Sequence, residues 1–187
     1  SGLPSDHPAL VRAGEWLLRE QVLTGGDWQV KVKGVEPGGW AFEFENDLYP
    51  DTDDTAEVLI ALARTPLPDE RRREKALERG RRWLLGMQSR NGGWGSFDKD
   101  NTSQLVTQIP FCDFGEVIDY PTEDVSAHVV EALCLLGETG SPAVQRALKY
   151  LRGEQRPDGS WWGRWGVNYI YGTGAVLPAL RAAGEGM

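Results

Sequence analysis

The spacing of apolar side chains along the chain is helical rather than alternating. Segments with an apolar residue every three or four positions lead into glycine-containing turns, and further apolar segments lie between those turns. The segments that lead into the turns are predicted to be the first helices of helix–turn–helix pairs. The further segments, at residues 53–65, 124–137 and 173–184, are predicted to be the second helices of these pairs. The pattern therefore indicates an all-α protein in which helix exceeds half of the residues and strand is negligible.

One motif recurs at a fixed interval. Residues 12–28 (RAGEWLLREQVLTGGDW), 79–94 (RGRRWLLGMQSRNGGW) and 146–161 (RALKYLRGEQRPDGSW) share an Arg, an aromatic residue, a Leu, a Gln, a turn and a final Trp. The Gln can hydrogen-bond loop backbone, and the Trp can cover the end of the helix. We expect a structural role for the repeated aromatic residues, which are Trp16, Trp28, Trp83, Trp94, Tyr150 and Trp161.

The repeat also predicts the architecture. The shared aromatic and Gln positions are 67 residues apart in both intervals, which is a strong signal of repeated helix pairs. Antiparallel pairs stack into an α-solenoid or close into an α/α-barrel (toroid). We expect residues 1–187 to form part of one such domain, with the 53–65 and 124–137 helices as neighbours in its inner layer.

Three carboxylates crowd the start of one predicted second helix. Asp51, Asp53 and Asp54 lie in the stretch PDTDDTA, directly before an apolar segment. Helix starts favour acids, so capping and solvation explain one or two of them. Mg²⁺ binding is an alternative, as is an acid kept protonated by its neighbours. His128 is either a satisfied histidine within a helix pair or the partner of these acids.

Composition removes several functional classes. The net charge of -8 makes nucleic acid a poor partner, and no apolar run approaches the ~18 residues that a spanning helix needs. Cys112 and Cys134 have no CxxC or Cys/His spacing, which argues against a disulfide framework or thiolate zinc site and favours a reducing compartment. The start SGLPSDHPAL lacks the order of a signal peptide. The irregular, Phe-rich stretch 95–122 is typical of a functional loop, and the charged run 68–82 of a solvated helix face.

These motifs together resemble a known family. The repeated motif is similar to the QW repeat of triterpene cyclases, and DTDD is similar to their DxDD motif. Four further blocks (GGWAFEFENDLYPDTDDTA, MQSRNGGWGSFDKDNTS, IPFCDFGEVIDYPTEDVSAH and PDGSWWGRWGVNYIYGTGAV) resemble bacterial squalene–hopene cyclases in the same order. The resemblance runs from Leu3 to Ala182. It implies a segment of a catalytic α/α-barrel, incomplete in this chain and inactive alone.

The resemblance also implies roles for individual residues. Asp53 would be the proton donor, Asp51 and Asp54 would supply the negative field, and His128 would increase the acidity of Asp53. Tyr171 would hydrogen-bond to this pair through water and help to reload the proton. The residues expected to line the cavity or its channel are Phe42, Phe97, Phe114, Trp165, Phe111 and Cys112. Neither a cofactor nor a metal is expected.

The same resemblance sets the expected partners. Full retention of the acid triad favours squalene as the substrate of the complete enzyme. Other partners would be the remainder of the cyclase chain and, through regions outside this segment, the cytoplasmic side of a bacterial membrane. A homodimer is among the assemblies that this resemblance allows. Two alternatives are a non-catalytic helical-repeat binding module and a zinc-dependent prenyltransferase subunit, although neither cysteine lies in a suitable block for the latter.

Overall fold

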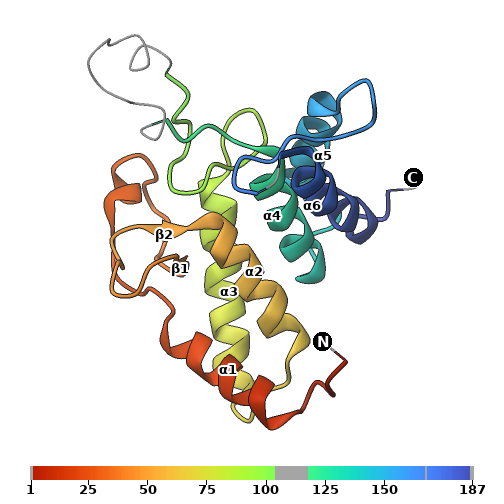
Figure 1. Ribbon diagram of the computed structural model, residues 1–187. Coiled ribbons are helices and arrows are strands. Elements are labelled where there is room, and N and C mark those ends of the chain that lie inside the picture. The colour runs from red at the N-terminus through yellow and green to blue at the C-terminus, as the bar shows by residue number, and fades with distance from the viewer. Residues whose placement is uncertain (1, 104–117, 167, 186–187) are drawn as a thin grey trace.

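Six α-helices dominate the computed structural model, which describes residues 2–103, 118–166 and 168–185 (Figure 1). The helices are α1 (Pro8–Arg19), α2 (Thr52–Arg64), α3 (Glu70–Met87), α4 (Glu123–Leu135), α5 (Pro142–Glu154) and α6 (Asn168–Ala182). Strand is confined, in this described part, to the antiparallel pair β1 (Trp40–Ala41) and β2 (Pro50–Asp51). The all-α prediction is confirmed. α-Helix covers about half of the described residues, and the 3-10 helix η1 (Asp27–Val30) takes the helical share just past half, in line with the prediction; long irregular segments follow α1 and α3.

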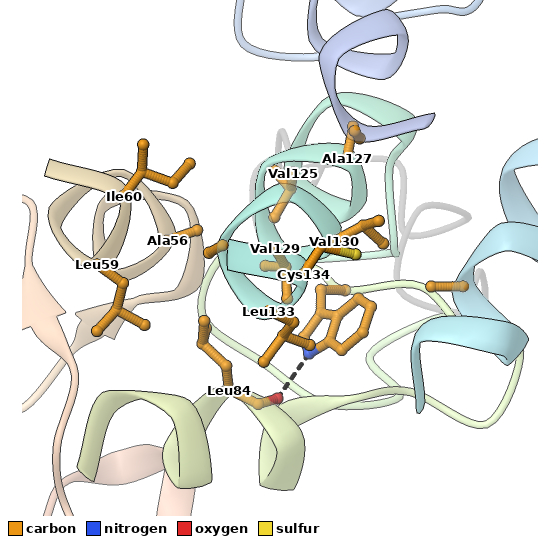
Figure 2. Packing of buried hydrophobic residues seen from close by; sticks show 14 of the residues in the cluster. Ala56, Leu59, Ile60, Leu84, Val125, Ala127, Val129, Val130, Leu133 and Cys134 are labelled. Atoms are coloured by element: carbon orange, nitrogen blue, oxygen red, sulfur yellow. Dashed lines mark hydrogen bonds between the residues drawn. The ribbon is translucent and has the colours of Figure 1, made fainter. Parts of the chain in front are cut away.

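Helices α2, α4 and α6 form a row with α4 at its centre. Helix α4 packs against α2 on one side and α6 on the other, while α3 packs on α2 and α5 packs on α4. Figure 2 shows Leu59 of α2 and Leu133 of α4 among the side chains that fill the space between these helices. Both are fully buried, so truncating either to Ala should cost about 2–5 kcal/mol. The predicted adjacency of the second helices is therefore present.

The helix starts follow ordinary capping chemistry. Asp51, Asp69 and Ser141 each accept a hydrogen bond from a first-turn backbone N–H of the helix that follows. The charged run predicted to be a solvated face begins α3, where Glu and Arg side chains pair three positions apart. Helix α6 begins at Asn168, five residues before the predicted start. Its aromatic first turn has weak helical propensity, and packing against α4 supplies the stabilisation instead.

A tryptophan covers the end of the first helix in every repeat. The indole nitrogen of Trp94 donates to the Leu84 carbonyl at 2.7 Å, the bond drawn as a dashed line in Figure 2. Trp161 donates to the Leu151 carbonyl at the same distance. Carbonyls in the last turn of a helix lack an intrahelical partner, so each indole satisfies a group that would otherwise be buried unpaired.

The equivalent tryptophan of the first repeat is Trp40 rather than Trp28. The Trp40 indole donates to the Leu17 carbonyl at 2.7 Å. Trp40 follows its Gln by 19 positions, whereas Trp94 and Trp161 follow theirs by six, so an insertion hides the match in the sequence. Trp28 lies within that insertion and packs edge-on against Trp83, with ring centroids 5.8 Å apart. In the first repeat, Trp40 therefore takes the structural place that Trp94 and Trp161 hold in the other two.

The same tryptophans are also tied to the second helices. The backbone N–H of Trp40 donates to the Thr55 hydroxyl at 2.8 Å, and that of Trp94 donates to the Ser126 hydroxyl at 2.9 Å. In the third repeat, the Trp161 N–H donates to Thr173 at 3.0 Å. Each repeat thus joins its first helix, its turn and its second helix through one tryptophan.

The repeated Gln and Gly residues link each repeat to the next. Gln21 donates to the carbonyl of Ala76 on α3, and Gln88 donates to that of Ala143 on α5, each at 2.9 Å. A Cβ on Gly93 would lie 2.8 Å from the Tyr150 ring, so only glycine allows α5 to approach the turn so closely. The predicted tie between helix and turn is present, and it extends across the repeat boundary.

Candidate active site

Asp51 positions the acidic cluster as the N-cap of α2. Its backbone is extended, and its carboxylate accepts hydrogen bonds from the N–H groups of Asp53 at 2.6 Å and Asp54 at 3.1 Å. The Asp51 residue is only 6% exposed. Capping therefore explains Asp51, the one member of the triad that precedes the helix, and it leaves the other two carboxyl groups available.

Burial and mutual repulsion disfavour a full set of negative charges at this helix start. Burial, with the nearby charges of Asp54 and Asp53, raises the pKa of Asp51 well above its usual range. Burial also raises the pKa of Asp54, and the charges of Asp53 and Glu57 act in the same direction. The cluster can therefore retain a proton at a pH where isolated aspartates have lost theirs.

His128 lies across the α2–α4 interface from Asp53. Its Nδ1 atom is 2.6 Å from Asp53 Oδ1, so the predicted approach of these two residues is present. Burial opposes a charge on the imidazole, but the hydrogen bond to Asp53 and the charges of Asp53, Glu57 and Asp124 raise the pKa of His128 overall. An imidazolium at this position stabilises a negative charge on the Asp53 carboxylate.

Glu57 is a fourth carboxyl group at this site and was not predicted from the sequence. Its Oε1 atom is 3.7 Å from the same Nδ1 atom of His128. Burial and the charge of Asp53 raise the pKa of Glu57 despite the opposing charge of His128. The available signal was its spacing, because Glu57 follows Asp53 by four positions and therefore shares its helix face.

Tyr171 of α6 completes the immediate surroundings of His128. Its ring is perpendicular to the imidazole, with the centroids 6.0 Å apart. Burial and the neighbouring carboxylates, Asp53 first, raise the pKa of Tyr171 to about 12, so its hydroxyl keeps its proton near neutral pH. The contact is between rings, and the water-bridged role of the hydroxyl stays a prediction.

The aromatic residues expected to line the cavity are distributed over two places. Phe42 and Phe97 line one cavity of about 260 Å³ together with Tyr49, and Phe42 is 72% exposed. Trp165 instead lies beside α4, where its backbone N–H donates to Asp124 at 3.0 Å. The remaining three predicted residues, Phe111, Cys112 and Phe114, lie outside the described residues.

Asp119 and Arg164 hold two of these aromatic segments, and neither residue was predicted from the sequence. The Asp119 carboxylate accepts three backbone N–H bonds at 2.6–3.0 Å, from Ser96, Phe97 and Asp98. The Arg164 guanidinium is 3.7 Å from Asp119 and lies over the Trp165 ring. Burial raises the pKa of Asp119, although these hydrogen bonds and Arg164 oppose the shift. Only the fold brings Asp119 and Arg164 together.

The described residues offer neither an evident metal site nor a membrane-spanning helix. In residues 2–103, 118–166 and 168–185, no group of three or more His, Cys, Asp or Glu side chains is arranged to hold a metal ion. Over the same ranges, none of the helices combines the length and hydropathy required to cross a membrane. The acidic cluster of α2 is organised instead by capping and by the contact with His128.

Fold and site together define a helical-repeat α/α protein with a paired acid and histidine in the row of α2, α4 and α6. The chain matches the family described as "Squalene-hopene cyclase C-terminal domain" over residues 1–187. It is 59% identical to a squalene–hopene cyclase of Alicyclobacillus acidocaldarius, covering 98% of this chain and 29% of that protein. A squalene–hopene cyclase of Bradyrhizobium diazoefficiens is 48% identical, covering 95% of this chain and 27% of the relative.

A plant relative extends the comparison beyond bacteria. Dammaradiene synthase of Dryopteris crassirhizoma is 46% identical, with 96% of this chain and 28% of that protein covered. The chain therefore belongs to the squalene–hopene cyclase family, as part of its C-terminal, α/α-toroid domain. It spans a little over a quarter of the length of these curated relatives.

Proposed function

We propose that this chain carries the acid of a squalene–hopene cyclase and that Asp53 protonates the terminal alkene of squalene. The observation that carries the proposal is the 2.6 Å contact between Asp53 and His128 beside two further aspartates. An alkene is a very weak base, so its acid must keep a proton at working pH and still release it with a large driving force. Repulsion within the cluster serves the first need, and His128 serves the second.

The cation formed by protonation needs stabilisation without a nucleophile. Faces of aromatic rings provide this through cation–π attraction, worth about 2 kcal/mol or more when desolvated. Phe42 and Phe97, which line a common cavity, and Trp165 are the described residues that we assign to this task. Each ring closure moves the positive charge along the polyene, and exclusion of water prevents its capture as an alcohol.

The complete protein, rather than this segment, is proposed to be the working enzyme. Two of the predicted cavity residues that the structure describes, Phe42 and Trp165, are exposed here. A cation formed at so open a surface would meet water. We therefore also propose that the remainder of the cyclase chain closes the cavity, and that this remainder supplies the membrane contact through which squalene arrives.

Conversion of squalene by the complete protein tests the proposal. Purified protein is incubated with squalene or with its terminal epoxide, and the extracted products are identified by mass spectrometry. We expect hopene-type products from squalene, and no product from residues 1–187 alone. Conversion of the epoxide but not of squalene would contradict the assignment of a strong acid. Failure to convert either substrate would favour the non-catalytic binding module.

A further inference from the structure

We infer that Glu57 reloads the acid: it passes protons from solvent to Asp53 through the Nδ1 atom of His128. This role rests on the proposed function, because it concerns how the acid is restored after each protonation of substrate. The structure places two carboxyl groups on one ring nitrogen, Asp53 at 2.6 Å and Glu57 at 3.7 Å. A proton can therefore leave that nitrogen toward Asp53 and be replaced from Glu57.

The positions of the three groups relative to solvent favour this direction of transfer. The side chain of Glu57 is 55% exposed, whereas that of His128 is 14% exposed. Glu57 lies four positions after Asp53 on α2, so both carboxyl groups face the ring from the same helix. The Asp53 side chain is 21% exposed, so water reaches Glu57 most readily of the three, and the imidazole contacts both carboxyl groups.

The charges around this site keep both relay groups able to carry a proton. His128 is faced by Asp53 and Glu57 from α2, by Asp124 from its own helix and by Tyr171 from α6. Glu57 is influenced in addition by Glu131 across the interface and by Arg64 farther along α2. Burial and the two negative neighbours outweigh His128 and Arg64, and the pKa of Glu57 is raised from its usual 4.5.

The proton count closes over one cycle. After Asp53 has protonated an alkene, it is a carboxylate facing the imidazolium of His128. The Nδ1 proton moves to Asp53 Oδ1, which restores the acid and leaves a lone pair on Nδ1. Rotation of the Glu57 side chain closes its 3.7 Å gap, and its carboxyl proton moves to that lone pair. Glu57 then takes one proton from solvent, so the net change is one proton delivered to Asp53.

First-turnover and steady-state rates in the complete protein separate reloading from protonation of substrate. With squalene as the probe, Glu57→Gln should leave the first turnover within about twofold of the unmutated protein and slow later turnovers by about tenfold or more, giving a burst. The deficit should shrink as the pH falls, because solvent then protonates the acid pair directly. Glu57→Asp, which keeps a carboxyl group, should recover part of the steady-state rate.

Glu131→Gln is the matched control. Glu131 lies on α4 and pairs with Arg64 at 2.8 Å, so this variant removes a nearby negative charge without removing a contact to the ring. It should show no burst. Equal slowing of the first and later turnovers in Glu57→Gln would make Glu57 a structural residue and overturn the inference, as would an unchanged steady-state rate. No product from the unmutated protein would refute the proposed function itself and, with it, this role.

Discussion

The starts of α2 and α4 are built on the same framework but hold their acids in different ways. The tryptophan N–H bonds to Thr55 and Ser126 place these two residues at equivalent positions of their repeats. Counting back two positions from each makes Asp124 the counterpart of Asp53. The starts of α2 and α4 are therefore structurally equivalent, and Asp53 and Asp124 can be compared directly.

The surroundings of the two acids differ. Asp53 Oδ1 faces the Nδ1 atom of His128, which lies on the neighbouring helix α4. Asp124 is fully buried and accepts two backbone bonds at 3.0 Å, from the N–H groups of Val125 and Trp165. A carboxylate held by backbone donors anchors a loop, whereas one paired with an ionisable ring can exchange a proton. The role of an acid is therefore decided by the groups that contact its carboxylate rather than by its position in the repeat.

The largest expected effect is the loss of activity in Asp53→Asn. The amide cannot donate a proton with useful driving force, so squalene conversion by the complete protein should fall by about 10²–10⁴-fold. In Asp124→Asn, one of two backbone donors loses its acceptor, which should cost about 1–3 kcal/mol of folding free energy and leave most of the activity. Product yield and chemical unfolding, measured on both variants, check this contrast. Substantial activity in Asp53→Asn would show that Asp53 is not the acid.

The shared framework can be tested by comparing two tryptophans. Trp94→Phe leaves the Leu84 carbonyl buried without its donor, which should cost about 1–3 kcal/mol in addition to lost packing. Trp28→Phe should cost less, because among the described residues the buried indole nitrogen of Trp28 has no hydrogen-bond partner. Urea unfolding of both variants measures the difference. Equal destabilisation would place Trp28 within the framework and weaken the alignment of the two helix starts.

The two caps are expected to differ by a smaller amount. Asp51→Ala removes an N-cap that accepts two backbone bonds, and the loss should be about 1 kcal/mol. The counterpart of Asp51 is Thr122, whose side chain makes no capping bond and whose buried hydroxyl lacks a partner in the described structure. Thr122→Val should therefore be neutral or slightly stabilising. A loss of 1 kcal/mol or more in Thr122→Val, on the scale of a cap, would contradict this distinction.

The smallest effect concerns the pH dependence of stability. The pKa of His128 is raised in the fold, since Asp53 and other acids outweigh the effect of burial. Its contribution to stability is therefore fully present below about pH 6.5, the usual value, and is lost as the pH rises through the higher value in the fold. Thermal unfolding of the complete protein from pH 6 to pH 9 should show this decline, and His128→Gln should flatten it. An identical slope in both proteins would indicate that His128 is not charged.

The local features of this fold are those that sequence could predict. Apolar spacing and the 67-residue repeat predict the helix pairs, because both are properties of neighbouring positions. The contact between Asp53 and His128 was also predicted, through the family resemblance and the adjacency of their helices. The assignment of catalytic roles to these residues remains a prediction that only activity measurements can test.

The features that sequence could not predict depend on distance in three dimensions. Trp28 matches the motif in the sequence. Only the bond from the Trp40 indole to the Leu17 carbonyl shows that Trp40, and not Trp28, covers the end of α1. Asp119 and Arg164 are 45 positions apart and meet through the packing of two irregular segments. Glu57 gives a clear spacing signal once Asp53 is chosen, but its contact with His128 requires the interface between α2 and α4.

Because the indole bonds of Trp40, Trp94 and Trp161 hold each helix pair together, residues at the site can change without loss of the fold. Each indole bond is accepted by a backbone carbonyl, a group that mutation of the side chain does not remove. The backbone N–H of each tryptophan requires only a Ser or Thr hydroxyl on the second helix. The first repeat shows that a long insertion can enter the turn without breaking the bond between Trp40 and Leu17. A duplicated helix pair can consequently acquire an acid, a histidine or a new loop while it keeps the tryptophan hydrogen bonds that join its two helices.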